Sequence, residues 1–419
     1  MGLLIDHHCH GVVTRELDRA GFEALISEGG APPPGDTNFD TPVGLAIRRH
    51  CAPRLDLPEH ASPEDYLARR AELGTEEVTR RLLATTGTAR YLVDTGFNAE
   101  GLTTPEQLAG ITGARAHHVV RLEKVAEDLA SDGVDPAEFA GAFRDRLHRA
   151  VADVGAVGVK SVAAYRTGFR LDPAPPGAAE VTAAVARWGG TTRLADPVLQ
   201  RFTLEAAVEL GLPIQFHVGF GDRDIRMTDV DPTLLSDWIG RHRVPVMLLH
   251  CWPYQRQASF LAAVFPNVHV DVGLALHYVG PRRGVAVLAE LAEVAPFTRA
   301  VLLGRVRRSG AVPAGSARLR HGTDRAAGGP GRQRRMGPGR RRAHRRPDRA
   351  RQRRTRLPAI NRADGRHQKI AVPHGCPIGD SHQRVRILSR QLRLEPGRRR
   401  GPQLRRADRR GRSGLPPDP

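Results

Sequence analysis

Ile5–His10 read I-D-H-H-C-H, directly after the apolar residues Leu3 and Leu4. An apolar run that ends in polar side chains is typical of a strand whose end carries chemistry. Side chains at positions i and i+2 of a strand point to the same face, so His8 and His10 can reach one metal ion. Two histidines do not complete a metal site, and the remaining ligands must come from elsewhere in the chain.

Strand-like runs recur after this stretch, with amphipathic helical stretches between them. The expected strands are residues 3–5, 91–93, 118–122, 156–159, 213–216, 245–249, 268–272 and 300–303. Eight strands that alternate with helices over about 300 residues predict an α/β protein with a (β/α)8 barrel rather than an open sheet. An insertion is expected at about residues 29–61, after the first strand. The absence of a G-x-G-x-x-G motif argues against a dinucleotide-binding fold.

Polar side chains stand at the carboxyl ends of the expected strands, where barrels of this kind place their chemistry. Lys160 ends strand four in G-V-K-S, His217 ends strand five in P-I-Q-F-H, and His250 ends strand six in M-L-L-H. A lone histidine or lysine at a strand end is more often a structural hydrogen-bonding or ion-pairing residue. The joint pattern of four histidines with a carboxylate instead suits Zn²⁺ or a similar divalent metal, with one position left for water.

The arrangement resembles the amidohydrolase superfamily, whose barrels carry His-x-His on strand one, histidines on strands five and six, and aspartate on strand eight. The segments D-H-H-C-H, V-K-S-V-A-A-Y-R-T-G, F-H-V-G-F-G-D and L-L-H-C-W-P are similar to the branch that includes domains fused to glutamine-synthetase-like proteins. The resemblance extends from about Met1 to Leu303. It implies four metal ligands, which are His8, His10, His217 and His250.

The resemblance also implies a metal-dependent hydrolase that cleaves a C–N bond of a small polar substrate with a metal-activated water. Lys160 matches a strand-four lysine that some members carbamylate to bridge two metals, and it could equally bind the substrate. Arg121, Glu123 and Arg166 are candidates to hold the substrate, although Arg121 and Glu123 could instead pair with each other or with a neighbouring helix. One or two Zn²⁺ ions are expected. A metal-dependent decarboxylase or lyase on the same barrel is the alternative.

Residues 305–419 differ from the rest of the chain in composition. They contain 34 Lys and Arg, of which 33 are Arg, against 7 Asp and Glu, and they lack Phe, Tyr and Trp. Residues 1–304 are acidic, with 30 basic and 38 acidic side chains, so the tail supplies the whole-chain net charge of +19. A disordered tail is one interpretation. A nucleic-acid-binding extension is another, although such segments generally mix Lys with Arg and interleave aromatic residues.

Out-of-frame translation of a GC-rich gene is the third interpretation of the tail, and we favour it. Leu303–Pro313 can be encoded so that a one-base shift reads S-D-A-F-G-G-P-E-L-Y, and Arg351–Pro358 so that the same shift reads D-N-A-G-R-V-Y-R. The first segment recovers the Ser-Asp that the resemblance requires at strand eight. The chain as written has Gly304-Arg305 there, and arginine cannot accept a proton. We therefore expect a barrel incomplete at strand eight and an impaired enzyme; a genuine loss of the aspartate would instead favour a catalytically inactive binding domain.

The remaining features concern location and partners. The four cysteines form no C-x-x-C pair, no signal-like segment opens the chain, and no apolar run reaches the length of about 18 residues that a membrane helix needs. These features predict a cytoplasmic protein with no membrane partner. The expected partner is a small-molecule substrate, nucleic acid is not expected, and the sequence allows a homo-oligomer.

Overall fold

Eight parallel strands form one sheet in the computed structural model, which describes residues 4–97, 101–190 and 193–301. Each strand is hydrogen-bonded to the next one along the chain. The strands are β1 (Leu4–Cys9), β2 (Thr88–Asp94), β3 (Arg115–Arg121), β4 (Gly158–Ser161), β5 (Ile214–His217), β6 (Val246–Leu249), β7 (Val268–Asp271) and β8 (Ala300–Val301). The predicted α/β architecture is confirmed, as a curled sheet of the (β/α)8 type whose eighth strand has only two described residues.

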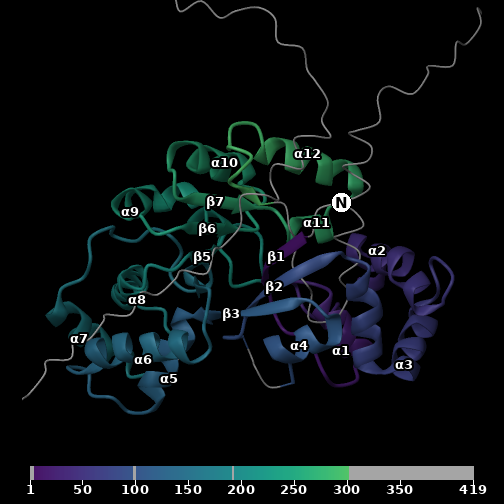
Figure 1. Ribbon diagram of the computed structural model, residues 1–419, viewed down its shortest axis with the longest axis horizontal. Helices are drawn as coiled ribbons and strands as arrows, with labels where there is room; N and C mark the ends of the chain where they lie inside the picture. The colour runs from purple at the N-terminus through teal and green to yellow at the C-terminus, as the bar shows by residue number, and fades with distance from the viewer. Residues whose placement is uncertain (1–3, 98–100, 191–192, 302–419) are drawn as a thin grey trace, which may run out of the picture.

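Helices surround the sheet and connect its strands (Figure 1). Figure 1 shows α5 to α8 on one side of the strands, α10 and α12 on another, and α1 to α4 on a third. The helices are α1 (Arg19–Leu25), α2 (Pro42–His50), α3 (Pro63–Ala84), α4 (Pro105–Thr112), α5 (Leu122–Ser131), α6 (Phe139–Asp153), α7 (Ala178–Trp188), α8 (Pro197–Glu209), α9 (Ser236–Arg241), α10 (Gln255–Val264), α11 (Ala275–Tyr278) and α12 (Pro281–Leu291). No helix among the described residues is long and apolar enough to cross a membrane.

Three of the longer connections use the same local signal to begin a helix. Ser62, Thr104 and Asp196 each precede a proline and accept a hydrogen bond from a backbone N–H of the first turn, at the starts of α3, α4 and α8. The side-chain oxygen satisfies a donor that the helix leaves open, and proline suits the first helical position because its fixed φ is already helical. These signals end each preceding loop at a defined residue.

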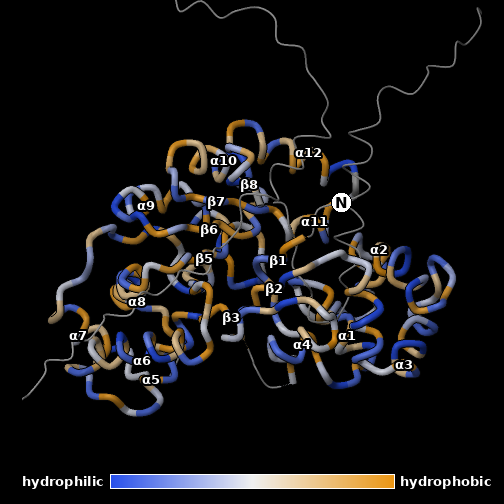
Figure 2. Tube along the Cα trace, in the orientation of Figure 1, coloured by the Kyte–Doolittle hydropathy of each residue, from blue (hydrophilic) through white to orange (hydrophobic). Residues whose placement is uncertain are grey.

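The main apolar core lies along strands β4 to β7 and the helices that cover them. Every residue of β5 is buried, and Val159, Ile214, Phe216 and Val246 have no exposed surface. In β5 the apolar residues Ile214 and Phe216 alternate with the buried polar residues Gln215 and His217. Figure 2 shows hydrophilic and hydrophobic segments alternating along the helices that surround the strands.

A second apolar core fills the connection between β1 and β2. Phe22, Phe39 and Tyr66 are fully buried there, and the rings of Phe22 and Phe39 stack with their centroids 5.5 Å apart. The insertion predicted at about 29–61 lies inside this helical unit, which already begins with α1 and continues into α3. Helix α3 bends at Gly74, whose φ of 73° is not helical.

The two edge strands of the sheet are β1 and β8. Within the described ranges β1 pairs with β2 and β8 pairs with β7, and no hydrogen-bonded pairing joins β8 to β1. A polar contact between β1 and β7 lies on this side, since His7 Nε2 is 3.2 Å from Asp271 Oδ2. The predicted strand-eight aspartate, the substitution Gly304-Arg305 and the tail 305–419 all lie outside the described residues.

Candidate metal centre

The structure brings together all four histidines that the strand-end pattern singled out. His8 and His10 come from the end of β1, His217 is the last residue of β5, and His250 follows β6. The ring centroids of His8 and His10 are 5.3 Å apart, those of His8 and His250 5.5 Å, and those of His217 and His250 4.7 Å. Each of the four side chains is at least nine-tenths buried. The imidazoles therefore form one enclosed group at the carboxyl ends of the strands.

Hydrogen bonds orient the two histidines of β1 so that the same ring nitrogen faces the group. His10 Nδ1 lies 3.1 Å from the backbone oxygen of Asp94, which can only accept, so Nδ1 carries the proton. His8 Nδ1 lies 3.0 Å from Gln215 Oε1, and Gln215 in turn donates its amide to the His7 carbonyl at 2.7 Å. Both rings are left with Nε2 as the lone-pair atom, which is how partners behind a metal site fix its ligands.

Asp94, the last residue of β2, adds a carboxylate that was not predicted as a ligand. Ligand atoms of His8, His10 and Asp94 all lie within 4.8 Å of one another, a spacing that could hold a metal ion. Burial alone would raise the pKa of Asp94, but the charge of Arg121, together with His10 and Lys160, outweighs burial and holds it well below its usual range. The signal in the sequence was the carboxylate directly after an apolar strand.

Lys160 extends from β4 into the same group. Its Nζ lies 2.8 Å from His8 Nε2 and 3.8 Å from Asp94 Oδ2, and the side chain is 3% exposed. The strand-four lysine is thus placed against a candidate metal ligand, as its position at the strand end predicted. An ammonium at this point would compete with a cation for the lone pair of His8, whereas a carbamylated lysine would add oxygen donors.

The loops after β5 and β6 approach closely and hold their histidines in contact. His250 has a φ of 73° and Cys251 a φ of 43°, a left-handed backbone that costs residues with side chains about 1–3 kcal/mol and that often marks functional sites. Gly219 has a φ of 71°, and a Cβ there would lie 2.2 Å from the Trp252 carbonyl oxygen. Only glycine fits this contact. The contact keeps His217 beside His250.

Glu123 corrects one expectation from the sequence. The sequence predicts a strand at 118–122, but β3 ends at Arg121 and α5 begins at Leu122. Glu123 is fully buried, and its Oε1 accepts hydrogen bonds from Ser161 Oγ at 2.8 Å, Val162 N at 2.9 Å and Gln200 Nε2 at 2.9 Å. An enclosed carboxylate has no surface for a substrate to contact. Glu123 is instead a positioning residue for the end of β4, which carries Lys160.

Replacement of Glu123 tests this positioning role. Glu123→Ala leaves three buried donors without their acceptor and is expected to lower the free energy of unfolding by about 3 kcal/mol or more. Glu123→Gln keeps an oxygen acceptor in place and is expected to cost about 1 kcal/mol at neutral pH. Urea unfolding of the two variants measures the difference. Equal losses would contradict the hydrogen-bonding role.

The difference in stability between the original chain and Glu123→Gln should depend on pH. Burial raises the pKa of Glu123 above its usual range. The native state then binds the proton more tightly than the unfolded chain, so the stability from this group is complete below the unfolded pKa of about 4.3 and is lost as pH rises through the native pKa. Glutamine does not ionise. The original chain should therefore lose stability relative to Glu123→Gln as the pH rises from about 4 through the raised native pKa of Glu123.

The two arginine candidates lie in different surroundings. Arg121 Nη2 contacts Asp94 Oδ2 at 2.5 Å, and its guanidinium lies 5.4 Å from the centre of the Phe97 ring, so it supports the candidate ligand Asp94. Arg166 follows the short helix η3 (Ala163–Tyr165) and lines a separate cavity. Arg166 is joined to the histidines through Tyr165, whose hydroxyl lies 3.0 Å from His217 Nε2.

Comparisons with known proteins agree with this geometry. A family model described as Amidohydrolase matches residues 5–302. Protein fluG of Emericella nidulans is 27% identical over 340 residues, which cover 71% of this chain and 38% of that protein, so the chain spans well under half of this relative's length.

One solved structure shows the same fold with a TM-score above 0.5. The crystal structure of a protein from Lactobacillus casei ATCC 334, provisionally assigned as a metal-dependent hydrolase, has a TM-score of 0.67 and 26% sequence identity, over 77% of this chain and 87% of that one. The uronate isomerase of Thermotoga maritima is less similar, with a TM-score of 0.47 and 13% identity over 76% and 86% of the two chains.

The family match begins inside β1 and ends just after β8, so it includes every strand end that carries a candidate ligand. The family predicted from the strand-end motifs is confirmed. The chain belongs to the amidohydrolase family.

Proposed function

We propose that this barrel is a metal-dependent hydrolase that cleaves a C–N, amide-like bond in a small polar substrate. The observation that carries the proposal is the enclosed group at the strand ends, in which donor atoms of His8, His10 and Asp94 lie within 4.8 Å of one another. The rings of His217 and His250 adjoin it. The amidohydrolase family is metal-dependent, which agrees with this donor set.

The chemistry of the donors suits a borderline divalent ion, and we propose Zn²⁺. Neutral imidazole nitrogens with a carboxylate oxygen are the ligands that Zn²⁺ commonly takes in proteins, whereas Mg²⁺ and Ca²⁺ prefer oxygen alone. When bound, such an ion activates the attacking water and polarises the scissile carbonyl. His8 and His10 would hold it through Nε2, with Gln215 behind the first ring and the Asp94 carbonyl behind the second.

The chemical form of Lys160 determines whether the centre would hold one metal ion or two. As a carbamate it would supply oxygen ligands to bridge two ions, and as an ammonium it would bind the substrate beside a single ion. Its Nζ lies 2.8 Å from His8 Nε2 and 3.8 Å from Asp94 Oδ2, so as an ammonium it would have to release the His8 lone pair before His8 could bind the ion. Metal content per chain, measured together with the protein mass under non-denaturing conditions, separates the two.

We further propose that the gene changes reading frame near codon 303, so that this chain is an impaired form of the enzyme. The support lies in the sequence: an Arg-rich tail nearly free of Lys, and a one-base shift that restores Ser-Asp at strand eight. Nucleic-acid binding by the tail is the competing function. Steep loss of DNA affinity with added salt, dependent on residues 305–419, would favour it.

Product analysis tests the reaction class. The chain is loaded with Zn²⁺ and incubated at high concentration with a panel of amides of amino acids and dicarboxylic acids. We expect slow release of amine or ammonia that stops when a chelator removes the metal. Release of CO₂ would favour the decarboxylase alternative. A chain that binds metal and substrate but gives no product would be an inactive binding domain.

A further inference from the structure

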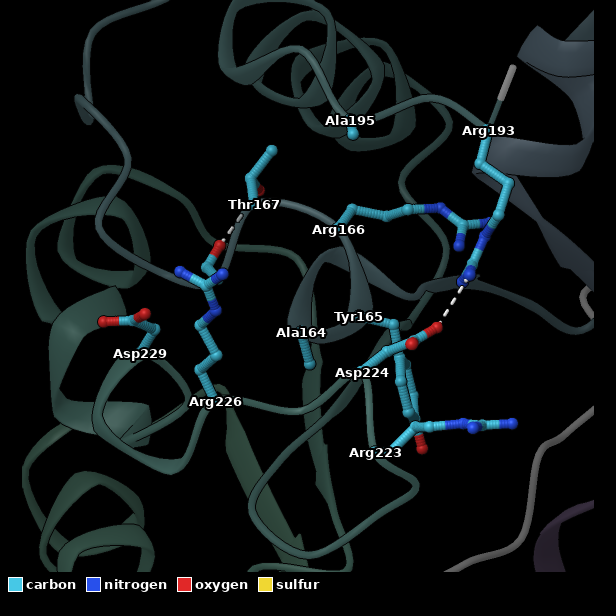
Figure 3. A pocket seen from close by; sticks show the side chains of 11 residues that line it. Ala164, Tyr165, Arg166, Thr167, Arg193, Ala195, Arg223, Asp224, Arg226 and Asp229 are labelled. Atoms are coloured by element: carbon cyan, nitrogen blue, oxygen red, sulfur yellow. Dashed lines mark hydrogen bonds and ion pairs between the residues drawn. The ribbon is translucent and has the colours of Figure 1, made fainter. Parts of the chain in front are cut away.

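A cavity of about 560 Å³ lies between the loops that follow β4 and β5, beside the candidate metal centre. Its wall includes four arginines, which are Arg166, Arg193, Arg223 and Arg226, and two aspartates, which are Asp224 and Asp229. Figure 3 shows the guanidinium groups of Arg166 and Arg193 directed toward one another, with Arg226 across from them beside Thr167. The positive charges of these arginines repel one another, so an anion bound between the guanidinium groups would be stabilised.

Neighbouring ion pairs leave the cavity with a net positive charge. Asp224 is paired with Arg193 at 2.7 Å, and Asp229 is paired at 3.3 Å with Arg170, which is not part of the wall. Among the residues that the structure describes, Arg223 and Arg226 have no ion-pair partner. The two carboxylates are thus already paired, and Arg223 and Arg226 add positive charge to the wall that no described carboxylate offsets.

Arg166 is a buried arginine in this wall. Its side chain is only 8% exposed, and its Nη2 contacts Glu127 Oε1 at 3.2 Å. The Nε and Nη1 atoms are buried and make no hydrogen bond with any described residue. A buried cationic donor without an acceptor is costly, and carboxylate and phosphate oxygens match the fork of a guanidinium. Arg166 therefore offers the cavity a preformed oxyanion site.

The cavity is joined directly to the histidines. Tyr165 lines it, and the hydroxyl of this residue lies 3.2 Å from His217 Nδ1. Gly221 packs on both side chains, because a Cβ there would lie 2.5 Å from the Tyr165 hydroxyl and 2.9 Å from His217 Nε2. A small molecule with one end in the cavity therefore has its other end next to the candidate metal centre.

We propose that this cavity binds an anionic group of the substrate, a carboxylate or a phosphate, at the end remote from the bond that is cleaved. The inference rests on the proposed function for the position of the scissile bond, but the anion site itself is independent of turnover. It narrows the substrate class from small polar molecules to acidic amides.

Calorimetric titration of the full chain tests the anion site. The probes are glutarate, inorganic phosphate, and the neutral diamide glutaramide as a matched control ligand. Saturable binding is expected for at least one of the two anions and not for glutaramide, and the comparison of glutarate with phosphate shows which oxyanion the site prefers. Arg166→Met should weaken anion binding about tenfold or more, as the loss of hydrogen bonds from a charged group predicts.

Two further variants keep the result interpretable. Arg226→Gln removes an exposed charge from the wall and should weaken anion binding several-fold without unfolding the chain, even if Arg166→Met does not fold. Arg187→Gln also removes an exposed arginine, one whose side chain is 60% exposed and paired with Asp196. Arg187 is not part of the wall, so this variant should leave binding unchanged. Failure of the original chain to bind either anion, or equal binding by glutaramide, overturns the proposal. So does unchanged affinity in Arg226→Gln.

The anion site and the proposed function can fail separately. Anion binding that Arg226→Gln weakens, together with no amine release from any amide by either the written or the frame-restored chain, would support the anion site and contradict the hydrolase. Hydrolysis of neutral and acidic amides at equal rates, with Arg226→Gln as active as the original chain, would support the hydrolase. It would contradict the proposal that the cavity binds an anionic group of the substrate.

Discussion

Replacement of both β1 histidines, His8→Ala with His10→Ala, is expected to abolish zinc binding at the strand ends. Loss of a partner behind a metal ligand typically lowers affinity about 10- to 100-fold, and loss of two ligands should exceed this. The remaining group would keep Asp94, His217 and His250, but it would lose both histidines whose ligand atoms lie within 4.8 Å of an Asp94 oxygen. Competition with a coloured chelator measures the affinity.

A graded series makes this expectation sharper. Gln215→Ala leaves every candidate ligand in place but removes the acceptor that holds His8 Nδ1. It should therefore weaken zinc binding by only about 10- to 100-fold, less than the double variant does. His118→Ala is the matched control, since His118 is a strand histidine that pairs with Glu106 at 2.7 Å and is not part of the group. Unchanged zinc affinity in the double variant would contradict a metal site at the strand ends. So would a loss of affinity in His118→Ala as large as the loss in the double variant.

The order of elements and the main candidate ligands could be predicted from the sequence, because both follow from local pattern. Strand positions agree with the expected runs to within a few residues, and the barrel puts the carboxyl ends of its strands at one end of the sheet. His8, His10, Lys160, His217 and His250 all stand at such ends, so their assembly follows once the barrel is assumed.

Contacts that depend on the path of the chain between elements could not be predicted in this way. Glu123 lies two residues after Arg121, and alternation would place both side chains on one face, but the helix that begins at Leu122 turns Glu123 behind β4. Asp94 was visible at the end of β2, yet its role depends on His10 and on Arg121 across the neighbouring strand. The cavity at Arg166 depends on loops whose conformation no periodic pattern describes.

A chain restored by the one-base shift at codon 303 is expected to hydrolyse its substrate about 10²- to 10⁴-fold faster than the chain as written. This factor is the usual contribution of a positioned general acid or base. The written sequence has Gly304-Arg305 where the shifted frame reads Ser-Asp. A guanidinium stays protonated and cannot take the proton of the attacking water, whereas an aspartate can. Steady-state release of amine from the best acidic amide, at equal zinc occupancy, measures the ratio.

The restored chain changes every residue after the shift, so the aspartate needs a control of its own. A restored chain in which only the recovered aspartate is replaced by asparagine keeps the new carboxyl-terminal sequence and loses only the proton acceptor. If this variant falls back to the rate of the written chain, the acid group accounts for the gain; if it keeps the full rate, the gain comes from the rest of the restored segment. Equal turnover by the written and restored chains would show that the candidate centre needs no acid from strand eight. Asp94 and Lys160, the two non-histidine groups that lie against His8 or His10, would then be the next candidates for the proton acceptor.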